Sequence, residues 1–186
     1  MRRVLIGLAF VLPLYACSNH APMQTVDYVD LDRFMGDWYV VANIPTFLEE
    51  GAHNAIETYA YNDDGSIDTT FTFYDGGFDG ELKKYNPTGF IKDTKTNALW
   101  GMQFIWPIKA DYRVVYLDED YSTTIIGREA RDYVWVMARS PYLTDEEFGQ
   151  LAQFIESIGY DRNKLQRVPQ KWPEGTGKLT TDRSES

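Results

Sequence analysis

The sequence predicts an all-β protein whose strands form one closed antiparallel barrel in up-and-down order, followed by a single α-helix. Three observations support this prediction: many short apolar stretches separated by turn residues, a period of two within those stretches, and one helical stretch near the C-terminus. About eight strands can be distinguished, a number at which a small barrel encloses a single ligand. The chain has 186 residues, 44% of them hydrophobic, which suffices for one domain with a sizeable core.

The strand boundaries follow the turn signals. Pro45 ends the first strand, the Asn-Asp-Asp-Gly turn at 62–65 separates the second from the third, and Asp75 with two following glycines ends the third. The fourth strand is weak and interrupted, and Pro107 ends the fifth. In chain order, the predicted strands are 38–44, 53–61, 67–74, 82–85 with 89–93, 98–106, 112–117, 122–127 and 133–139.

The helix is predicted directly after the last strand. Thr144 and Glu147 have the spacing of a capping box, in which the Glu147 side chain reaches back to the Thr144 backbone. Apolar residues then recur at helical spacing, and Gly159 is typical of a helix end. These apolar positions are Phe148, Leu151, Ala152, Ile155 and Ile158.

Residues 1–16 are typical of a secretory signal that is removed. Arg2 and Arg3 precede an uncharged apolar run that is too short to span a bilayer, and Ala16 is small, as a cleavage site requires. We expect residues 17–28 to form a tether, residues 29–172 the barrel domain, and residues 173–186 a polar, disordered tail.

Cys17, the only cysteine, follows this signal directly. Its position resembles the lipobox of bacterial lipoprotein precursors, although Tyr15 stands where a small or β-branched residue is usual. The resemblance implies diacylglycerol on the Cys17 sulfur, acylation of the new N-terminus and, because Ser18 follows, sorting to the outer membrane. The alternative is an ordinary secretory signal with an incidental cysteine.

The charge of the chain excludes several kinds of partner. Removal of Arg2 and Arg3 with the signal changes the net charge from −10 to −12. This acidity argues against nucleic-acid binding and against electrostatic adhesion to anionic lipid, so membrane attachment must depend on the acyl chains. If Cys17 is acylated, no thiol is left for a disulfide or a cysteine nucleophile.

Three motifs resemble those of the lipocalin family. Gly36 and Trp38 open the first strand, residues 118–121 (Asp-Glu-Asp-Tyr) lie at a late turn, and Arg139 ends the last strand. In this family the Trp closes the barrel floor and the Arg covers its indole, an interaction that contributes about 0.5–2 kcal/mol. The resemblance covers residues 29–172 and implies structural roles for Gly36, Trp38, Asp120 and Arg139, with the helix packed outside the barrel.

The resemblance extends to the bacterial, outer-membrane lipoprotein branch of that family. The supporting dipeptides are Asn86-Pro87 and Trp106-Pro107, together with the closing segment 168–170 (Val-Pro-Gln). A member of this branch is expected to be lipid-anchored in the outer membrane and to face the periplasm. Dimers occur in the branch, and the sequence leaves open whether two of these barrels pair.

The period of two predicts which residues face into the barrel, with Trp38 as the reference. The predicted lining is aromatic, aliphatic and methionine-containing, and some of these side chains are expected to fill the barrel rather than bind a ligand. The predicted lining residues are Val40, Ala42, Phe71, Trp100, Met102, Phe104, Trp106, Tyr112, Val114, Tyr116, Ile125 and Trp135.

Such a lining suits a single-chain lipid, such as a fatty acid or a lysophospholipid. Burial of about 12 methylenes at about 0.8 kcal/mol each, less the cost of association, gives an affinity that is roughly micromolar. The expected function is therefore binding, storage or transport of such lipids in the bacterial envelope. The alternatives are an enzyme acting on a lipid or pigment, and an anchored interaction protein whose acidic outer face matters more than its cup.

The sequence lacks the usual motifs of catalysis and metal binding. Neither His20 nor His53 has a nucleophile at a recognisable spacing, and the acidic turn at 118–120 is too short for a calcium loop. We therefore expect no enzyme activity, cofactor or metal. Glu57 and Glu129 fall in or beside strands, and either would be a candidate general base if it were buried inside the cup.

Overall fold

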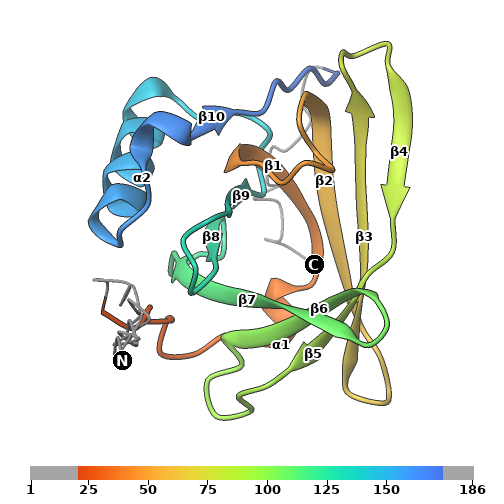
Figure 1. The fold of residues 1–186 in the computed structure, drawn as a ribbon, viewed down its shortest axis with the longest axis vertical. Helices are drawn as coiled ribbons and strands as arrows, with labels where there is room; N and C mark the ends of the chain where they lie inside the picture. The colour runs from red at the N-terminus through yellow and green to blue at the C-terminus, as the bar shows by residue number, and fades with distance from the viewer. Residues whose placement is uncertain (1–20, 174–186) are drawn as a thin grey trace, which may run out of the picture.

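The computed structural model describes residues 21–173 (Figure 1). Its helical segments are α1 (Leu31–Phe34), α2 (Asp145–Ser157) and the 3-10 turn η1 (Arg162–Lys164). Its strands are β1 (Gly36–Ile44), β2 (Ala52–Tyr61), β3 (Ser66–Asp75), β4 (Glu81–Tyr85), β5 (Thr88–Ile91), β6 (Leu99–Ile105), β7 (Ile108–Leu117), β8 (Thr123–Gly127), β9 (Val134–Ala138) and β10 (Gln166–Arg167). Within the described residues, no helix is long and apolar enough to cross a membrane.

The strands form one antiparallel sheet that closes on itself. Neighbours follow chain order, and β1 pairs with β9 to complete the barrel. Both β4 and β5 pair with β3, so together they occupy one position, as expected for an interrupted strand. The barrel therefore has eight strand positions in up-and-down order, and the predicted fold class is confirmed.

α2 lies where the capping box predicts it. The Thr144 hydroxyl accepts a hydrogen bond from the Glu147 backbone N–H (3.2 Å), and the Glu147 carboxylate accepts one from the Thr144 N–H (2.7 Å). The helix packs Leu151 and Ile155 into an apolar layer on the outer wall of the barrel (Figure 1). The sheet thus separates two cores, one inside the barrel and one beneath α2.

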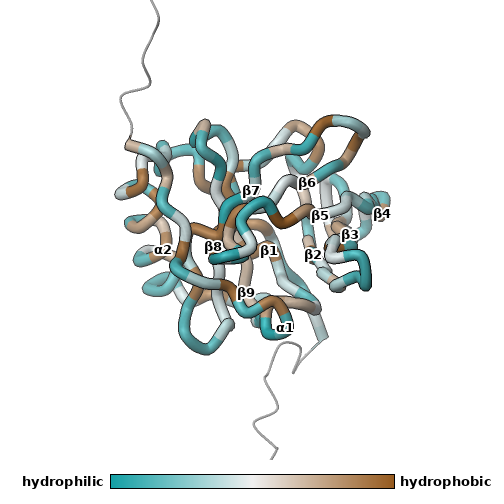
Figure 2. Tube along the Cα trace, turned by 90° about the horizontal axis from the view of Figure 1, so that it is seen from below, coloured by the Kyte–Doolittle hydropathy of each residue, from teal (hydrophilic) through white to brown (hydrophobic). Residues whose placement is uncertain are grey.

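The two ends of the barrel differ. α1, which was not predicted, is capped by Asp30, whose carboxylate accepts hydrogen bonds from the backbone N–H groups of Asp32 and Arg33. This short helix places Phe34 inside the barrel and marks the closed end. The β1–β2 loop, the β6–β7 turn and the β8–β9 loop lie at the open end. Figure 2 shows α1 at the bottom and the β6–β7 hairpin at the top.

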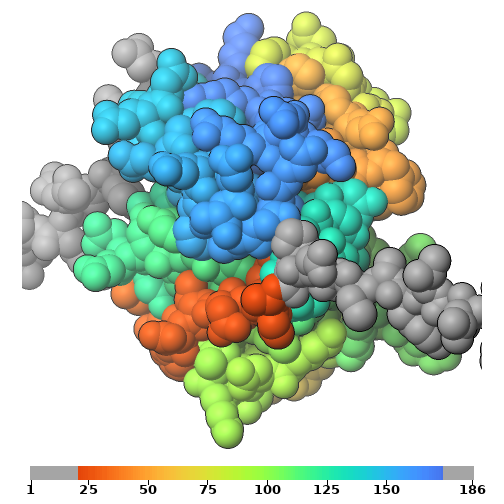
Figure 3. Space-filling view, turned by 60° about the vertical axis from the view of Figure 1, so that its left-hand side comes forward, coloured from red at the N-terminus to blue at the C-terminus, as the bar shows by residue number. Residues whose placement is uncertain are grey.

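Residues 21–28, the described part of the expected tether, are bound to the outside of the barrel. Val26 N–H donates to the Val114 carbonyl (2.9 Å), and just beyond the segment Val29 N–H donates to the Thr96 carbonyl (2.7 Å). Met23 is buried in the core beneath α2. Figure 3 shows the N-terminal segment lying against the barrel wall below α2. Residues 1–20 and 174–186, which include the predicted signal, Cys17, His20 and most of the predicted tail, lie outside the described residues.

Candidate functional site

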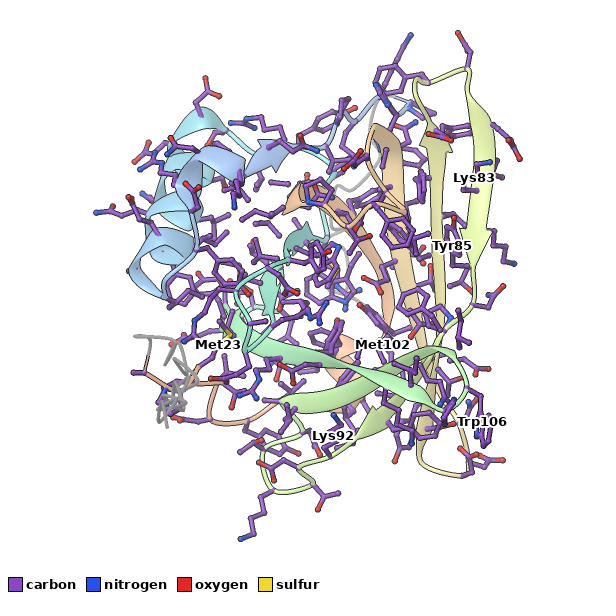
Figure 4. All side chains as sticks on the ribbon, viewed as in Figure 1. Met23, Lys83, Tyr85, Lys92, Met102 and Trp106 are labelled. Atoms are coloured by element: carbon purple, nitrogen blue, oxygen red, sulfur yellow. The ribbon has the colours of Figure 1, made fainter. Side chains whose placement is uncertain are left out.

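The open end of the barrel leads into a cavity of about 260 Å³. Its lining comes from the β1–β2 loop, from strands β2, β3, β4, β6, β7 and β9, and from the β8–β9 loop. Figure 4 shows Met102 inside the barrel. The lining residues are Thr46, Phe47, Leu48, Glu49, Glu57, Phe71, Tyr85, Met102, Phe104, Ala110, Asp111, Tyr112, Arg128, Tyr133 and Trp135.

The cavity floor is a packed aromatic layer. The Tyr112 ring stacks on Trp100 with 5.1 Å between ring centroids, and Trp100 meets Phe34 edge-on at 5.5 Å. The hydroxyls of Tyr59 and Tyr112 are hydrogen-bonded to each other at 2.6 Å. Burial raises the pKa of both phenols well above the ordinary value, so they remain neutral hydrogen-bonding groups. Below this layer the barrel is filled, so the cavity occupies only its upper part.

Glu57 places a carboxyl group inside the cavity. Its partners across the sheet, Trp38 and Phe71, both belong to the inner core, so its side chain shares the inward face. Burial raises the pKa of Glu57 to about 7, although a hydrogen bond from Tyr59 opposes the shift and the charge of Glu49 adds to it. Near neutral pH this carboxyl is therefore about half protonated.

Glu49 attaches the β1–β2 loop to the barrel mouth. Its carboxylate accepts a hydrogen bond from the Trp135 indole N–H (3.0 Å) and one from the Thr46 backbone N–H (3.0 Å). The residue is only 3% exposed, and burial raises its pKa despite these hydrogen bonds. The contact holds Phe47 and Leu48 at the edge of the cavity, where both contribute to its lining.

Arg128 is the basic residue that lines the entrance of the cavity. Its Nε lies 3.5 Å from an Asp132 oxygen and is buried without a hydrogen-bond acceptor. The other acidic groups nearby are already paired, because Asp111 and Glu129 each lie 2.9 Å from the Arg113 guanidinium. The Arg128 side chain is 24% exposed, and its terminal guanidinium nitrogens make no hydrogen bond within residues 21–173, so they can donate to an anionic group at the entrance. Glu129 is part of a surface ion-pair network and not of the cavity.

The closed end contains the predicted tryptophan–arginine contact. The Arg139 guanidinium lies 3.8 Å from the Trp38 ring centroid and donates to the backbone carbonyls of Asp37 (2.7 Å) and Met35 (2.8 Å), among others. Gly36 has a φ of +89°, which glycine adopts without strain. Burial lowers the pKa of Arg139 to about 10, so it stays charged at neutral pH. These residues close the barrel and do not touch the cavity.

A family comparison agrees with this architecture. Residues 29–170 match the model of the lipocalin-like domain. The chain belongs to the lipocalin family. This lipocalin is 31% identical over 158 residues to outer membrane lipoprotein Blc of Citrobacter freundii, an alignment that covers 83% of this chain and 89% of that protein. It is 30% identical over 157 residues to temperature-induced lipocalin-1 of Arabidopsis thaliana, which covers 80% and 83% of the two chains.

Solved structures show the same fold at lower identity. Insecticyanin from the tobacco hornworm Manduca sexta superposes on this lipocalin with a TM-score of 0.60 at 15% identity, over 87% of this chain and 90% of that chain. Lobster apocrustacyanin A1 superposes with a TM-score of 0.59 at 13% identity, over 76% and 79%. At these identities the likeness concerns the fold alone.

The twelve residues predicted to line the cavity fall into three groups. Five of them line the cavity: Phe71, Met102, Phe104, Tyr112 and Trp135. Three more face inward but pack in the core outside the cavity lining: Val40, Trp100 and Val114. The prediction is wrong for the other four residues: Ala42, Tyr116, Ile125 and Trp106.

Two β-bulges explain two of these errors. The register shifts between Val40 and Ala42 in β1, and again between Val114 and Tyr116 in β7. Each bulge adds one residue to its strand and reverses the side-chain alternation beyond it. Ala42 and Tyr116 consequently belong to the core beneath α2.

The other two errors have separate causes. Ile125 pairs with Tyr116 and shares its outward face, so the neighbouring Ile126 points inward instead. The strand β6 ends at Ile105, and Trp106 lies in the β6–β7 turn with 82% of its surface exposed. Figure 4 shows Trp106 at the far tip of that hairpin.

The turn at 118–121 makes its contacts through residues other than Asp120, which is exposed. The Asp118 carboxylate accepts a hydrogen bond from the Ser122 N–H (2.7 Å). The Tyr121 hydroxyl accepts one from the Asp30 N–H (2.8 Å), and the Arg33 guanidinium lies 4.0 Å from the Tyr121 ring centroid. The motif therefore joins α1 to the barrel floor, with Asp118 and Tyr121 as its effective members.

Sequence reasoning missed the lining residues that lie in loops or at strand ends. Ala110 and Asp111 were left out because the strand was predicted to begin at Tyr112, whereas β7 begins at Ile108. The β1–β2 loop gave no periodic signal that it folds back over the mouth. Among residues 21–173, no group of three His, Cys, Asp or Glu side chains is placed to hold a metal ion.

Proposed function

We propose that this lipocalin binds single-chain lipids in the cavity and carries or stores them at the bacterial outer membrane. The observation that carries the proposal is an apolar cavity, open at one end only, in a barrel of a family whose members bind small hydrophobic ligands. Phe71, Tyr85 and Met102 supply the apolar wall on which an acyl chain would pack.

The size of the cavity favours one acyl chain. A volume of about 260 Å³ holds about nine groups of roughly 30 Å³, the share of a water molecule in the liquid and a reasonable size for a methylene. Burial of about nine methylenes at about 0.8 kcal/mol each contributes about 7 kcal/mol. After the cost of association, the expected affinity is micromolar or weaker. A diacyl lipid would have to leave its second chain outside.

The charges favour one orientation of that lipid. A carboxylate headgroup at the floor would meet Glu57, whose negative charge at pH above about 7 would repel it. A phosphate or carboxylate at the mouth would instead meet Arg128. We therefore infer that the acyl tail enters the cavity first and that the headgroup stays at the entrance. This arrangement suits a lysophospholipid, and it suits a fatty acid whose carboxylate lies at the mouth.

The proposed location rests on Cys17 and on the relatives. Related proteins of Citrobacter freundii and Vibrio cholerae are named outer membrane lipoproteins, and the second is 27% identical over 175 residues, 92% of this chain. Acyl chains on Cys17 would anchor this lipocalin on the periplasmic side, and more than one chain would hold it firmly. Cys17→Ala should remove the protein from the membrane fraction, and unchanged recovery there would contradict the anchoring.

Filling the cavity tests the proposed ligand site. In a soluble form that begins at Ser18, Ala110→Trp adds an indole to the cavity wall, whereas Ala60→Trp adds the same group at an exposed position of β2. We expect Ala110→Trp to abolish binding of a fluorescent lysophospholipid with one site per barrel, while Ala60→Trp binds like the parent. Equal affinities in all three proteins would place the ligand elsewhere.

One observation favours a second candidate, an enzyme that acts on a lipid in the same cavity. Glu57 has a pKa of about 7, which suits a general base, and it lines the cavity. Mass spectrometry of lipid incubated with the protein distinguishes the two functions. Recovery of unchanged lipid supports binding, whereas a product that disappears in Glu57→Gln supports catalysis.

A further inference from the structure

Large apolar side chains are exposed around the cavity mouth. In the β6–β7 hairpin, Ile105 is 72% exposed, Trp106 82% and Ile108 68%, and in the β1–β2 loop Phe47 is 80% exposed. Leu48 and Phe104 are also exposed and line the cavity entrance. Large apolar side chains gathered and exposed at one end of a domain mark an interaction site. We call these six residues the mouth rim.

The mouth rim comes from two segments that the fold brings to one end of the barrel. Phe47 and Leu48 contact the same cavity as Phe104, so the two segments flank one opening. Figure 2 shows apolar positions of the β6–β7 hairpin at the top of the molecule, opposite α1.

The N-terminal segment approaches the same end of the barrel. The Ala21 carbonyl accepts a hydrogen bond from the Arg131 guanidinium (2.6 Å), and the Met23 N–H donates to the Glu129 carboxylate (3.2 Å). Arg131 and Glu129 belong to the β8–β9 loop at the open end. Because Cys17 is four residues before Ala21, its Cα can be at most about 14 Å from that of Ala21.

This geometry orients the anchored protein. Glu129 N–H donates to Asp111 of β7, which is three residues from the rim end of that strand and six from its closed end, about 10 Å against about 20 Å at ~3.3 Å per residue, so the N-terminal segment meets the barrel nearer the mouth. We propose that the mouth rim docks on the surface of the phospholipid bilayer that holds the acyl chains, so that the cavity opens onto the lipid. This inference rests on the proposed anchoring at Cys17.

The chemistry of the mouth rim suits a bilayer surface. The indole of Trp106 is amphipathic and prefers the headgroup level, whereas Ile105, Ile108 and Phe47 gain by entering the acyl boundary. Without residues 1–16 the net charge is −12, which gives no attraction to anionic lipid, so the contact must be apolar. The anchor raises the local concentration of the rim at the membrane, which allows a few apolar side chains to maintain docking.

Spin labels at the two ends test the docking. The full-length acylated chain is reconstituted in vesicles of phosphatidylethanolamine and phosphatidylglycerol, with a nitroxide on Ile105→Cys or on Tyr61→Cys. Tyr61 is the matched control, because it is 52% exposed and lies next to the closed-end turn between β2 and β3. Acylation of Cys17 leaves the introduced thiol as the only reactive one.

For each label we measure the ratio of its collision rate with oxygen, which concentrates in the bilayer, to its collision rate with an aqueous nickel chelate. We expect this ratio to be severalfold higher at position 105 than at position 61. If the protein sediments with the vesicles but both labels collide equally often with the nickel chelate, the docking is contradicted and the anchoring is not. Protein that does not sediment overturns both. A third outcome is that the label at position 105 stays protected from the nickel chelate after the vesicles are dissolved in detergent, and that its spectrum shows spin–spin broadening. This result would show that a second copy of the chain covers the rim, and it would also overturn docking on lipid.

A second measurement separates docking from the cavity itself. The double variant Ile105→Ser and Trp106→Ser removes the apolar tip of the hairpin, and neither residue lines the cavity. We expect severalfold slower transfer of lysophospholipid from the vesicles to the anchored protein, with unchanged equilibrium occupancy. An unchanged transfer rate would contradict the docking.

Discussion

The closed and open ends of this barrel use aromatic residues in opposite ways. At the closed end, Trp38 and Phe34 are fully buried, and Arg139 covers the indole while it binds backbone carbonyls of the α1 segment. At the open end, Trp106 and Phe47 are exposed beside a cavity that contains carboxyl groups. The closed end thus contributes stability, whereas the open end leaves apolar and ionisable groups available for a ligand or a membrane.

The largest expected effect separates the two ends directly. Trp38→Ala removes a fully buried indole and should lower the free energy of unfolding by about 3–5 kcal/mol. Trp106→Ala removes the same side chain from the exposed hairpin and should change stability by less than about 0.5 kcal/mol. Urea unfolding of both variants checks the comparison, and similar losses would show that the open end is also part of the stabilising core.

Arg139→Lys tests whether the guanidinium itself builds the closed end. A lysine keeps the charge, but it cannot reach several carbonyls at once or stack on Trp38 as a planar group. We expect a loss of about 2–3 kcal/mol, because buried carbonyls lose their donors. A double-mutant cycle with Trp38→Phe should show a coupling of at least about 0.5 kcal/mol. Strict additivity would contradict the stacked geometry.

The pH dependence of stability tests the open end. Burial raises the pKa of Glu57 from 4.5 to about 7, so between these pH values the folded protein binds more protons than the unfolded chain. The free energy of unfolding should therefore fall as pH rises from about 4.5 to 7, by on the order of 2 kcal/mol for a carboxyl partly screened in an open cavity. Glu57→Gln should remove most of this slope. A slope that persists unchanged would assign it to other groups, such as Glu49, whose pKa is raised in the same direction.

The smallest expected effect concerns the loop over the mouth. Glu49→Gln weakens the contact with Trp135 and should cost less than about 1 kcal/mol, because the amide oxygen still accepts one hydrogen bond. Lipid exchange, followed by Trp fluorescence, should become faster. Glu50→Gln in the same loop is the matched control, since Glu50 is exposed and lines no part of the cavity. Equal exchange rates in the two variants would show that the Glu49 contact does not gate the mouth.

The sequence alone predicted the parts of this protein that depend on neighbouring residues. Thr144 and Glu147 identify the start of α2, because a capping box involves residues only three apart. The alternation in β6 correctly places Trp100, Met102 and Phe104 on the inward side. The family motifs correctly place Arg139 over Trp38, although those residues are a hundred positions apart.

Only the tertiary structure decided what depends on pairing between distant segments. The bulges before Ala42 and Tyr116 arise from register between strands, and one added residue reverses every inward and outward position that follows. The cavity position of Glu57 and the docking of residues 21–28 likewise depend on contacts far apart in the chain. Local sequence encodes strand length and periodicity, but which face becomes the interior is determined by the closure of the barrel, in which all strands take part.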